Sequence, residues 1–194
     1  IGSPHILMLS GVGPAAHLKE MGVPVVHDLA GVGQNLRDPP IVFVTWKTKP
    51  DVELDGFAPR TQACLRYTAE GSDLRNDMII IMSSYATERV NRGGGRMAPL
   101  GIRMTVALYL AVGSGEMKLQ STDPNQQPFL DYNYLQEEFD RSRMRDGVLK
   151  AVELGRHPDY QALVEELIEK CASDADITRR DIEDTEILER TLFA

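Results

Sequence analysis

The chain has 194 residues, of which 42% are hydrophobic and 26% charged, as is ordinary for a soluble globular protein. Its net charge of −8 argues against a nucleic-acid-binding protein, which needs a basic surface. No apolar stretch reaches the roughly 20 residues of a membrane-spanning helix. The sequence begins at Ile1, within an apolar segment and without Met, so we expect a piece of a longer protein.

The first element contains a G-x-G-x-x-A pattern at 11–16, between two apolar runs, with Asp28 after the second run. A strand, a glycine turn and a helix in this order would bind a dinucleotide. Two features favour another interpretation. Ser3-Pro4 predicts a helix start with serine as the N-cap, and only about two helical turns fit between Pro14 and Gly22. We therefore favour a corner between two short helices, with the dinucleotide fingerprint as the alternative.

The next segments are rich in β-branched and aromatic residues, which are typical of strands. The glycine-rich segment 112–116 indicates a hairpin connection, and 91–96 a flexible loop. Strands joined in this way, without helices between them, indicate an antiparallel sheet. The predicted strands are 41–47, 63–68, 77–83, 102–112 and 116–120.

Helical periodicity replaces the strand pattern after residue 124. One helix is expected over 139–154, ending at Gly155, and a second from Pro158 to Ile168. A third is expected over 179–192, with Asp176 or Thr178 as its cap. The predicted fold class is α+β: an antiparallel β-sheet packed with helices, with short helices at the N-terminus and a helical C-terminal tail.

Three blocks then carry a family resemblance. They are "GSPHILMLSGVGP" at 2–14, "DLAGVGQNLRD" at 28–38, and a weaker block from Gly115 through Asp123-Pro124 to "YNYL" at 132–135. Their order and content resemble the GMC (glucose–methanol–choline) oxidoreductases, a family of flavoenzymes, and most nearly its choline dehydrogenase-like branch. The resemblance implies that 1–40 is the end of a flavin-domain sequence and that 41–194 is a substrate-binding domain.

The resemblance implies an FAD-dependent oxidoreductase that acts on the CH-OH groups of alcohols. The family's N-terminal nucleotide-binding unit and its C-terminal catalytic histidine block have no counterpart in this sequence. We therefore assign no catalytic residue here, and we expect this chain alone to retain no FAD and to be inactive. Family position suggests that the cofactor-binding residues are Gly2, Ser3, Pro4, Asn35 and Asp38.

The substrate side of the sheet offers four aromatic candidates for substrate-binding residues, and an aromatic cage would suit a choline-like cation. They are Trp46, Tyr67, Tyr85 and Tyr109. The four histidines and two cysteines have no metal-ligand spacing, so no metal is expected. Cys64 and Cys171 belong to no C-x-x-C pair, which favours two free thiols in a reducing, cytoplasmic location and leaves a disulfide as the alternative.

Two other functions fit the same residues. The chain could be a freestanding, FAD-free binding module that forms a homodimer, since an uncovered apolar surface marks an interface. It could also belong to a cyanohydrin lyase-like enzyme, because such lyases share this scaffold. The expected partner in the intact enzyme is a small-molecule alcohol, with no nucleic acid and no membrane span.

Overall fold

The computed structural model describes residues 1–52, 59–87, 99–167 and 176–177. The chain forms two compact units, and it crosses between them after Asp38, Leu110 and Glu137. Unit 1 comprises Ile1–Asp38 and Ala111–Glu137, and unit 2 comprises Pro39–Leu110 and Glu138–Ala194. The first crossing lies two residues before the predicted domain boundary at 40. That boundary remains a prediction, because compactness within this chain does not define the domains of a longer protein.

Unit 1 begins with two short helices, α1 (Gly2–Leu9) and α2 (Ala15–Glu20). The predicted corner between them is present, and Gly11 allows it with a left-handed φ of +83°. A Cβ on Gly11 would lie 2.3 Å from the carbonyl oxygen of Pro24, so only glycine fits. Asp28 caps α2, because its Oδ1 accepts the Ala15 N–H at 3.0 Å. The prediction of a Ser3 N-cap was wrong, since α1 already begins at Gly2 and Ser3 lies in its first turn.

Unit 1 also contains two small sheets. β1 (Val12–Gly13) pairs in parallel with β2 (His27–Asp28), and β3 (Gln34–Leu36), β8 (Gly115–Lys118) and β9 (Phe129–Asp131) form an antiparallel sheet in the order β3-β8-β9. The predicted hairpin at 112–116 was therefore wrong, because β8 pairs within unit 1 and not with the preceding strand. The core of unit 1 consists of Met8, Leu18, Val23, Val32, Met117 and Leu119.

Unit 2 is built on a larger sheet, in which all neighbouring strands are antiparallel except β11, the strand that pairs in parallel with β4. The strand order is β10-β4-β7-β6-β5, and this sheet confirms the predicted α+β class. The strands are β4 (Ile41–Thr48), β5 (Thr61–Tyr67), β6 (Met78–Thr87), β7 (Pro99–Leu108), β10 (Val164–Leu167) and β11 (Asp176–Ile177).

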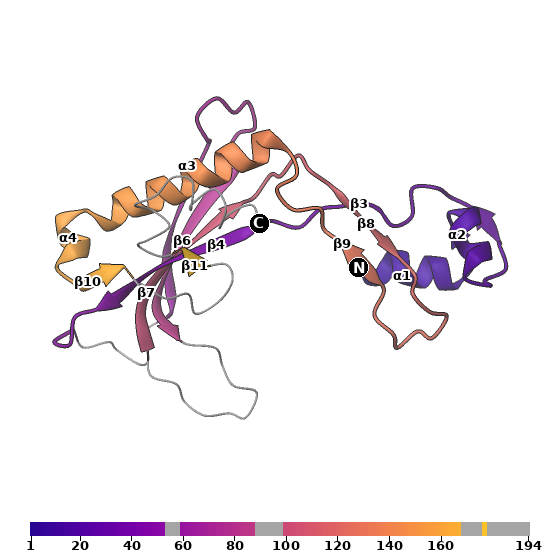
Figure 1. The fold of residues 1–194 in the computed structure, drawn as a ribbon, viewed down its shortest axis with the longest axis horizontal. Helices are drawn as coiled ribbons and strands as arrows, with labels where there is room; N and C mark the ends of the chain where they lie inside the picture. Colours follow the sequence, from indigo (N-terminus) through magenta and orange to yellow (C-terminus); the bar gives the residue numbers. More distant parts are fainter. Residues whose placement is uncertain (53–58, 88–98, 168–175, 178–194) are drawn as a thin grey trace. The chain divides into compact units, whose positions relative to one another are not determined.

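One face of this sheet is covered by α3 (Glu138–Gly155), which packs against β4, β6 and β7 (Figure 1). Two glycines of α3 allow the helix to approach the sheet closely. A Cβ on Gly147 would lie 2.7 Å from Val106 Cγ1, and one on Gly155 would lie 2.3 Å from Trp46 Cζ2. Val42, Val44 and Trp46 of β4 are buried at alternate positions, as expected when one face of a strand meets a helix, and Thr45 between them is buried as well.

The second predicted helix is much shorter than expected. It is α4 (Pro158–Gln161), with His157 as the N-cap and Pro158 at its first position. The extension to Ile168 was wrong, because Val164–Leu167 forms β10 on the edge of β4. The third predicted helix, at 179–192, and the loop at 91–96 lie outside the described residues. No helix in the described ranges is long and apolar enough to cross a membrane.

Candidate functional site

Three of the predicted cofactor residues form the first turn of α1. Gly2 and Ser3 are exposed and Pro4 is half-buried, and space is open around Gly2, where an added Cβ would meet nothing within 4 Å. The N-cap residue, Ile1, offers no side-chain hydrogen bond to the free N–H groups of this turn. Free N–H groups at a helix start favour an anionic group such as a phosphate.

The other two predicted cofactor residues lie around β3. Asn35 is exposed and has a left-handed φ of 57°. Asp38 accepts a hydrogen bond from the Tyr134 hydroxyl at 2.5 Å, and the Tyr134 ring stacks on Tyr132 with centroids 5.0 Å apart. Partial burial and the bond to Asp38 both raise the pKa of Tyr134, so this hydroxyl remains a donor. Tyr134 belongs to the "YNYL" block, but its pairing with Asp38 could not be predicted from sequence.

Among the predicted substrate aromatics, Trp46 and Tyr67 lie on the side of the sheet that meets α3, whereas Tyr109 contacts Arg66. Trp46 is 5% exposed and packs edge-to-face on Tyr160, with ring centroids 5.2 Å apart, beneath the end of α3. Tyr67 faces the same helix, and its buried hydroxyl has no hydrogen-bond partner among the described residues. Burial, with smaller effects of nearby carboxylates, raises the pKa of Tyr67 to about 12. Both side chains therefore lie between the sheet and α3.

Tyr109 lies just beyond the end of β7, is 46% exposed, and contacts the guanidinium of Arg66 at 5.1 Å from its ring centroid. Arg66 is on the opposite side of β5 from Tyr67, because successive strand residues alternate between faces. The side chain of Tyr85 lies outside the described residues. Substrate binding by these four residues remains a prediction.

The face of the unit 2 sheet turned away from α3, which we call the distal face, carries a different set of residues. Strand alternation places on it Phe43 and Thr45 of β4, Ile79 and Ile81 of β6, and Arg103 and Thr105 of β7. Arg103 lies over the Phe43 ring at 4.2 Å, and its Nε donates to Thr45 Oγ1 at 3.1 Å. The distal face is therefore apolar at its centre, with a guanidinium held in place beside it. The alternation of residues along the strands could have identified this face, but the sequence prediction selected Trp46, Tyr67, Tyr85 and Tyr109 because they are aromatic.

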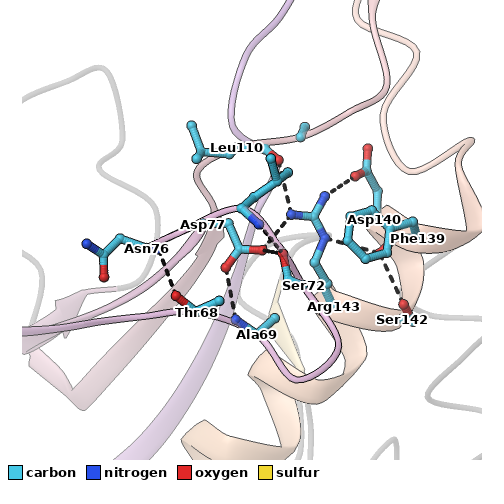
Figure 2. A network of polar contacts seen from close by, with 12 residues as sticks. Thr68, Ala69, Ser72, Asn76, Asp77, Leu110, Phe139, Asp140, Ser142 and Arg143 are labelled. Carbon is cyan, nitrogen blue, oxygen red and sulfur yellow. Dashed lines mark hydrogen bonds and ion pairs between the residues drawn. The ribbon is translucent and has the colours of Figure 1, made fainter.

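Figure 2 shows a buried polar network that was not expected from sequence. Arg143 of α3 donates from Nη1 to Asp77 Oδ2 at 2.7 Å and from Nη2 to Asp140 Oδ1 at 2.5 Å. All three side chains are at most 1% exposed. Burial alone would raise the pKa of the Asp77 carboxyl, but hydrogen bonds from Ser72, Ala69 and Arg143 outweigh it and lower that pKa. Their helical spacing could have indicated that Asp140 and Arg143 are buried, because both lie on the same side of the helix as the apolar Met144.

Metal binding finds no support in the described part of the chain. No group of three or more histidine, cysteine, aspartate or glutamate side chains there could hold a metal ion. Each unit has its own candidate site: the distal face in unit 2, and the α1 start with the Asn35–Asp38 segment in unit 1.

Comparison with known proteins agrees with this architecture. A GMC oxidoreductase family model matches residues 111–191. The oxygen-dependent choline dehydrogenases of Burkholderia lata and Burkholderia cenocepacia are both 31% identical to this chain in an alignment 178 residues long, and the match covers 81% of this chain and 31% of each relative. The chain belongs to the GMC oxidoreductase family. It spans about a third of the length of these choline dehydrogenases.

Solved structures confirm the fold. A formate oxidase variant from Aspergillus oryzae matches 97% of this chain and 40% of its own, with a TM-score of 0.73 and 19% identity. A fungal aryl-alcohol oxidase matches 97% of this chain and 41% of its own, with a TM-score of 0.66 and 17% identity. The two units thus have the arrangement of secondary structure that is found in part of these enzymes.

Proposed function

We propose that this chain is part of an FAD-dependent oxidoreductase that acts on the CH-OH group of an alcohol, with a choline dehydrogenase-like activity in the whole protein. The observation that carries the proposal is the 31% identity with two oxygen-dependent choline dehydrogenases over 81% of this chain. The named relatives are oxidoreductases, which favours this function over a cyanohydrin lyase or a freestanding binding module.

The residues of unit 1 suit FAD chemically. The uncapped first turn of α1 offers the backbone N–H groups of Gly2 and Ser3 to an anionic part of the cofactor, while Pro4 has no N–H and can only contribute packing. Asn35 and Asp38 offer an amide and a carboxylate on the surface of the same unit. FAD, when bound, supplies the hydride-accepting chemistry, and the protein supplies orientation and electrostatics. On this proposal, Tyr134 orients Asp38 for hydrogen bonding to the cofactor.

The distal face would line the substrate cavity in the whole enzyme. Phe43, Ile79 and Ile81 would exclude water from the reacting alcohol, and Arg103, held by the buried Thr45 hydroxyl, would supply a polar contact at its side. In keeping with the family resemblance, the proposal assigns no catalytic base to this chain. A cytoplasmic location is also part of the proposal, which the lack of a C-x-x-C pair in the sequence supports.

The test uses the full-length flavoenzyme with Ile81→Ala on the distal face and Leu149→Ala on the exposed side of α3 as the matched control. We expect Ile81→Ala to lower kcat/KM for the alcohol about tenfold, since buried pocket methylenes carry discrimination of this size. Leu149→Ala should leave kcat/KM unchanged. Equal effects of the two substitutions, or none, would refute a substrate role for the distal face.

Cofactor retention by the 194-residue chain alone is tested separately. After incubation with FAD and desalting, we expect no flavin absorbance near ~450 nm, because the nucleotide-binding unit of the family has no counterpart here. Stoichiometric retention of FAD would show that this chain builds a complete cofactor site.

A further inference from the structure

The places where the chain leaves and enters unit 2 lie close together. The Leu108 N–H donates to the Pro40 carbonyl at 3.1 Å, which joins the end of β7 to the residues just after the first crossing. The N–H groups of Tyr109 and Leu110 both donate to the Asp77 carbonyl, at 2.7 and 3.2 Å. The last residues before the second crossing are thus held at the start of β6.

One guanidinium connects the second crossing with the third. Arg143 Nη1 donates to the Leu110 carbonyl at 3.1 Å, and Nε donates to the Phe139 carbonyl at 3.2 Å. The same guanidinium lies over the Phe139 ring at 4.0 Å from its centroid. Leu110 is the last residue before one crossing, and Phe139 is the second residue after the other. A lysine could keep the charge but not this set of directed bonds.

The Asp77 carboxylate extends the connection to the turn between β5 and β6. Its Oδ2 accepts from Arg143 Nη1 and from Ser72 Oγ at 2.6 Å, while Oδ1 accepts the Ala69 N–H at 2.9 Å. Figure 2 shows these bonds converging on one carboxylate and one guanidinium. Breaking one of them would leave a buried charge short of partners, which is costly, so the bonds form and break together.

We propose that the Asp77–Arg143–Asp140 network couples the segments of unit 2 that adjoin the three crossings, so that they open and close as one cooperative unit. The β5–β6 turn, the end of β7 and the start of α3 then open together and separately from the centre of the sheet. This proposal is independent of the cofactor and substrate, since every bond in it lies within unit 2.

The test is native-state hydrogen exchange on the 194-residue chain. In the unsubstituted protein, the amides of Ala69, Leu108, Tyr109 and Leu110 should share one opening equilibrium, as members of one cooperative unit do. Arg143→Lys should lower the protection of all four by a common factor of at least ~10, while the central β7 amides, such as that of Val106, change less than ~3-fold. Arg141→Lys is the matched control, because Arg141 pairs with Glu138 on the surface of the same helix.

Two results would overturn the proposal. Loss of protection at Leu110 alone would mean that the contacts are independent of one another. An equal loss at Val106 would mean that the network only supports the general stability of unit 2. If Arg143→Lys does not fold, Asp140→Asn gives the same readout, since it keeps the shape of the side chain and weakens one bond to Arg143.

Discussion

Gly155→Ala tests whether Trp46 is a fixed core residue beneath α3. Gly155 is the last residue of the helix, and its φ lies outside the left-handed region, so alanine is compatible with the backbone there. The added Cβ would nevertheless lie 2.3 Å from Trp46 Cζ2 and 2.8 Å from Cε2. Favourable carbon contacts need about 3.5–4.0 Å. Either the indole or the end of the helix must move.

The indole has little room to move, because it is 5% exposed and packs against Tyr160. Overpacking of this kind costs about 1–3 kcal/mol. Alanine would gain back at most ~1 kcal/mol of helix propensity relative to glycine, and less at a helix end. We therefore expect Gly155→Ala to lower the free energy of unfolding of unit 2 by roughly 1–2 kcal/mol.

Urea unfolding followed by far-ultraviolet circular dichroism measures this change from the midpoint and the m-value. The same substitution in a Trp46→Phe background is the control, because phenylalanine lacks the outer ring that the added methyl group would strike. There the cost of Gly155→Ala should fall by at least half, giving a coupling of about 1 kcal/mol. An equal cost in both backgrounds, or no cost in either, would refute the packing of Trp46 described above.

Three further results are expected. The pKa of Asp77 in the folded protein lies below its ordinary value of 3.8. The carboxylate therefore stabilises the fold above pH 3.8, and this stabilisation is lost as the pH falls through the folded-state pKa. Asp77→Asn should lower the free energy of unfolding at pH 7 and flatten its acid dependence in urea titrations. The buried hydroxyl of Tyr160 has no hydrogen-bond partner among the described residues, so Tyr160→Phe should be neutral or stabilising at pH 7. Burial also raises the pKa of Tyr160, so the same substitution should reduce the loss of stability above pH ~10. In the full-length flavoenzyme, Tyr134→Phe should raise the Kd for FAD several-fold, because Asp38 loses the hydrogen bond that holds it. The thermal midpoint should change little, since the substitution opens no cavity. An unchanged Kd would mean that Tyr134 does not support the cofactor site.

Much of the unit 2 sheet could be predicted because its signals are local. The β-branched runs that became β4 and β6 favour strands whatever they pair with, and the period of α3 extends over 18 residues to its end at Gly155. The Gly11 corner was also predictable, because only about two helical turns fit between Pro14 and Gly22, which is short for the crossover helix of a dinucleotide fold.

Two of the errors fall where pairing between distant segments outweighs the local pattern. Val164 and Leu167 have helical spacing, yet this segment joins the edge of β4, where its backbone groups find partners. The 112–116 segment resembles a hairpin connection, yet Gly115 begins a strand that pairs with β3 from the start of the chain. The residues of these two segments do not by themselves determine that they form strands, because each strand depends on a free edge of another strand far away in the sequence.

The candidate site divides in the same way. The sequence by itself determined the fold class and the motifs that resemble the GMC oxidoreductases, because each is a local pattern of residue types; the cofactor residues remain a prediction from that resemblance. Only the tertiary structure decided that Trp46 lies under α3, that Tyr134 bonds Asp38, and that Asp77 and Arg143 form a buried ion pair. Asp77 and Arg143 are 66 residues apart, and a charge becomes worth burying only where folding brings its partner within hydrogen-bonding distance.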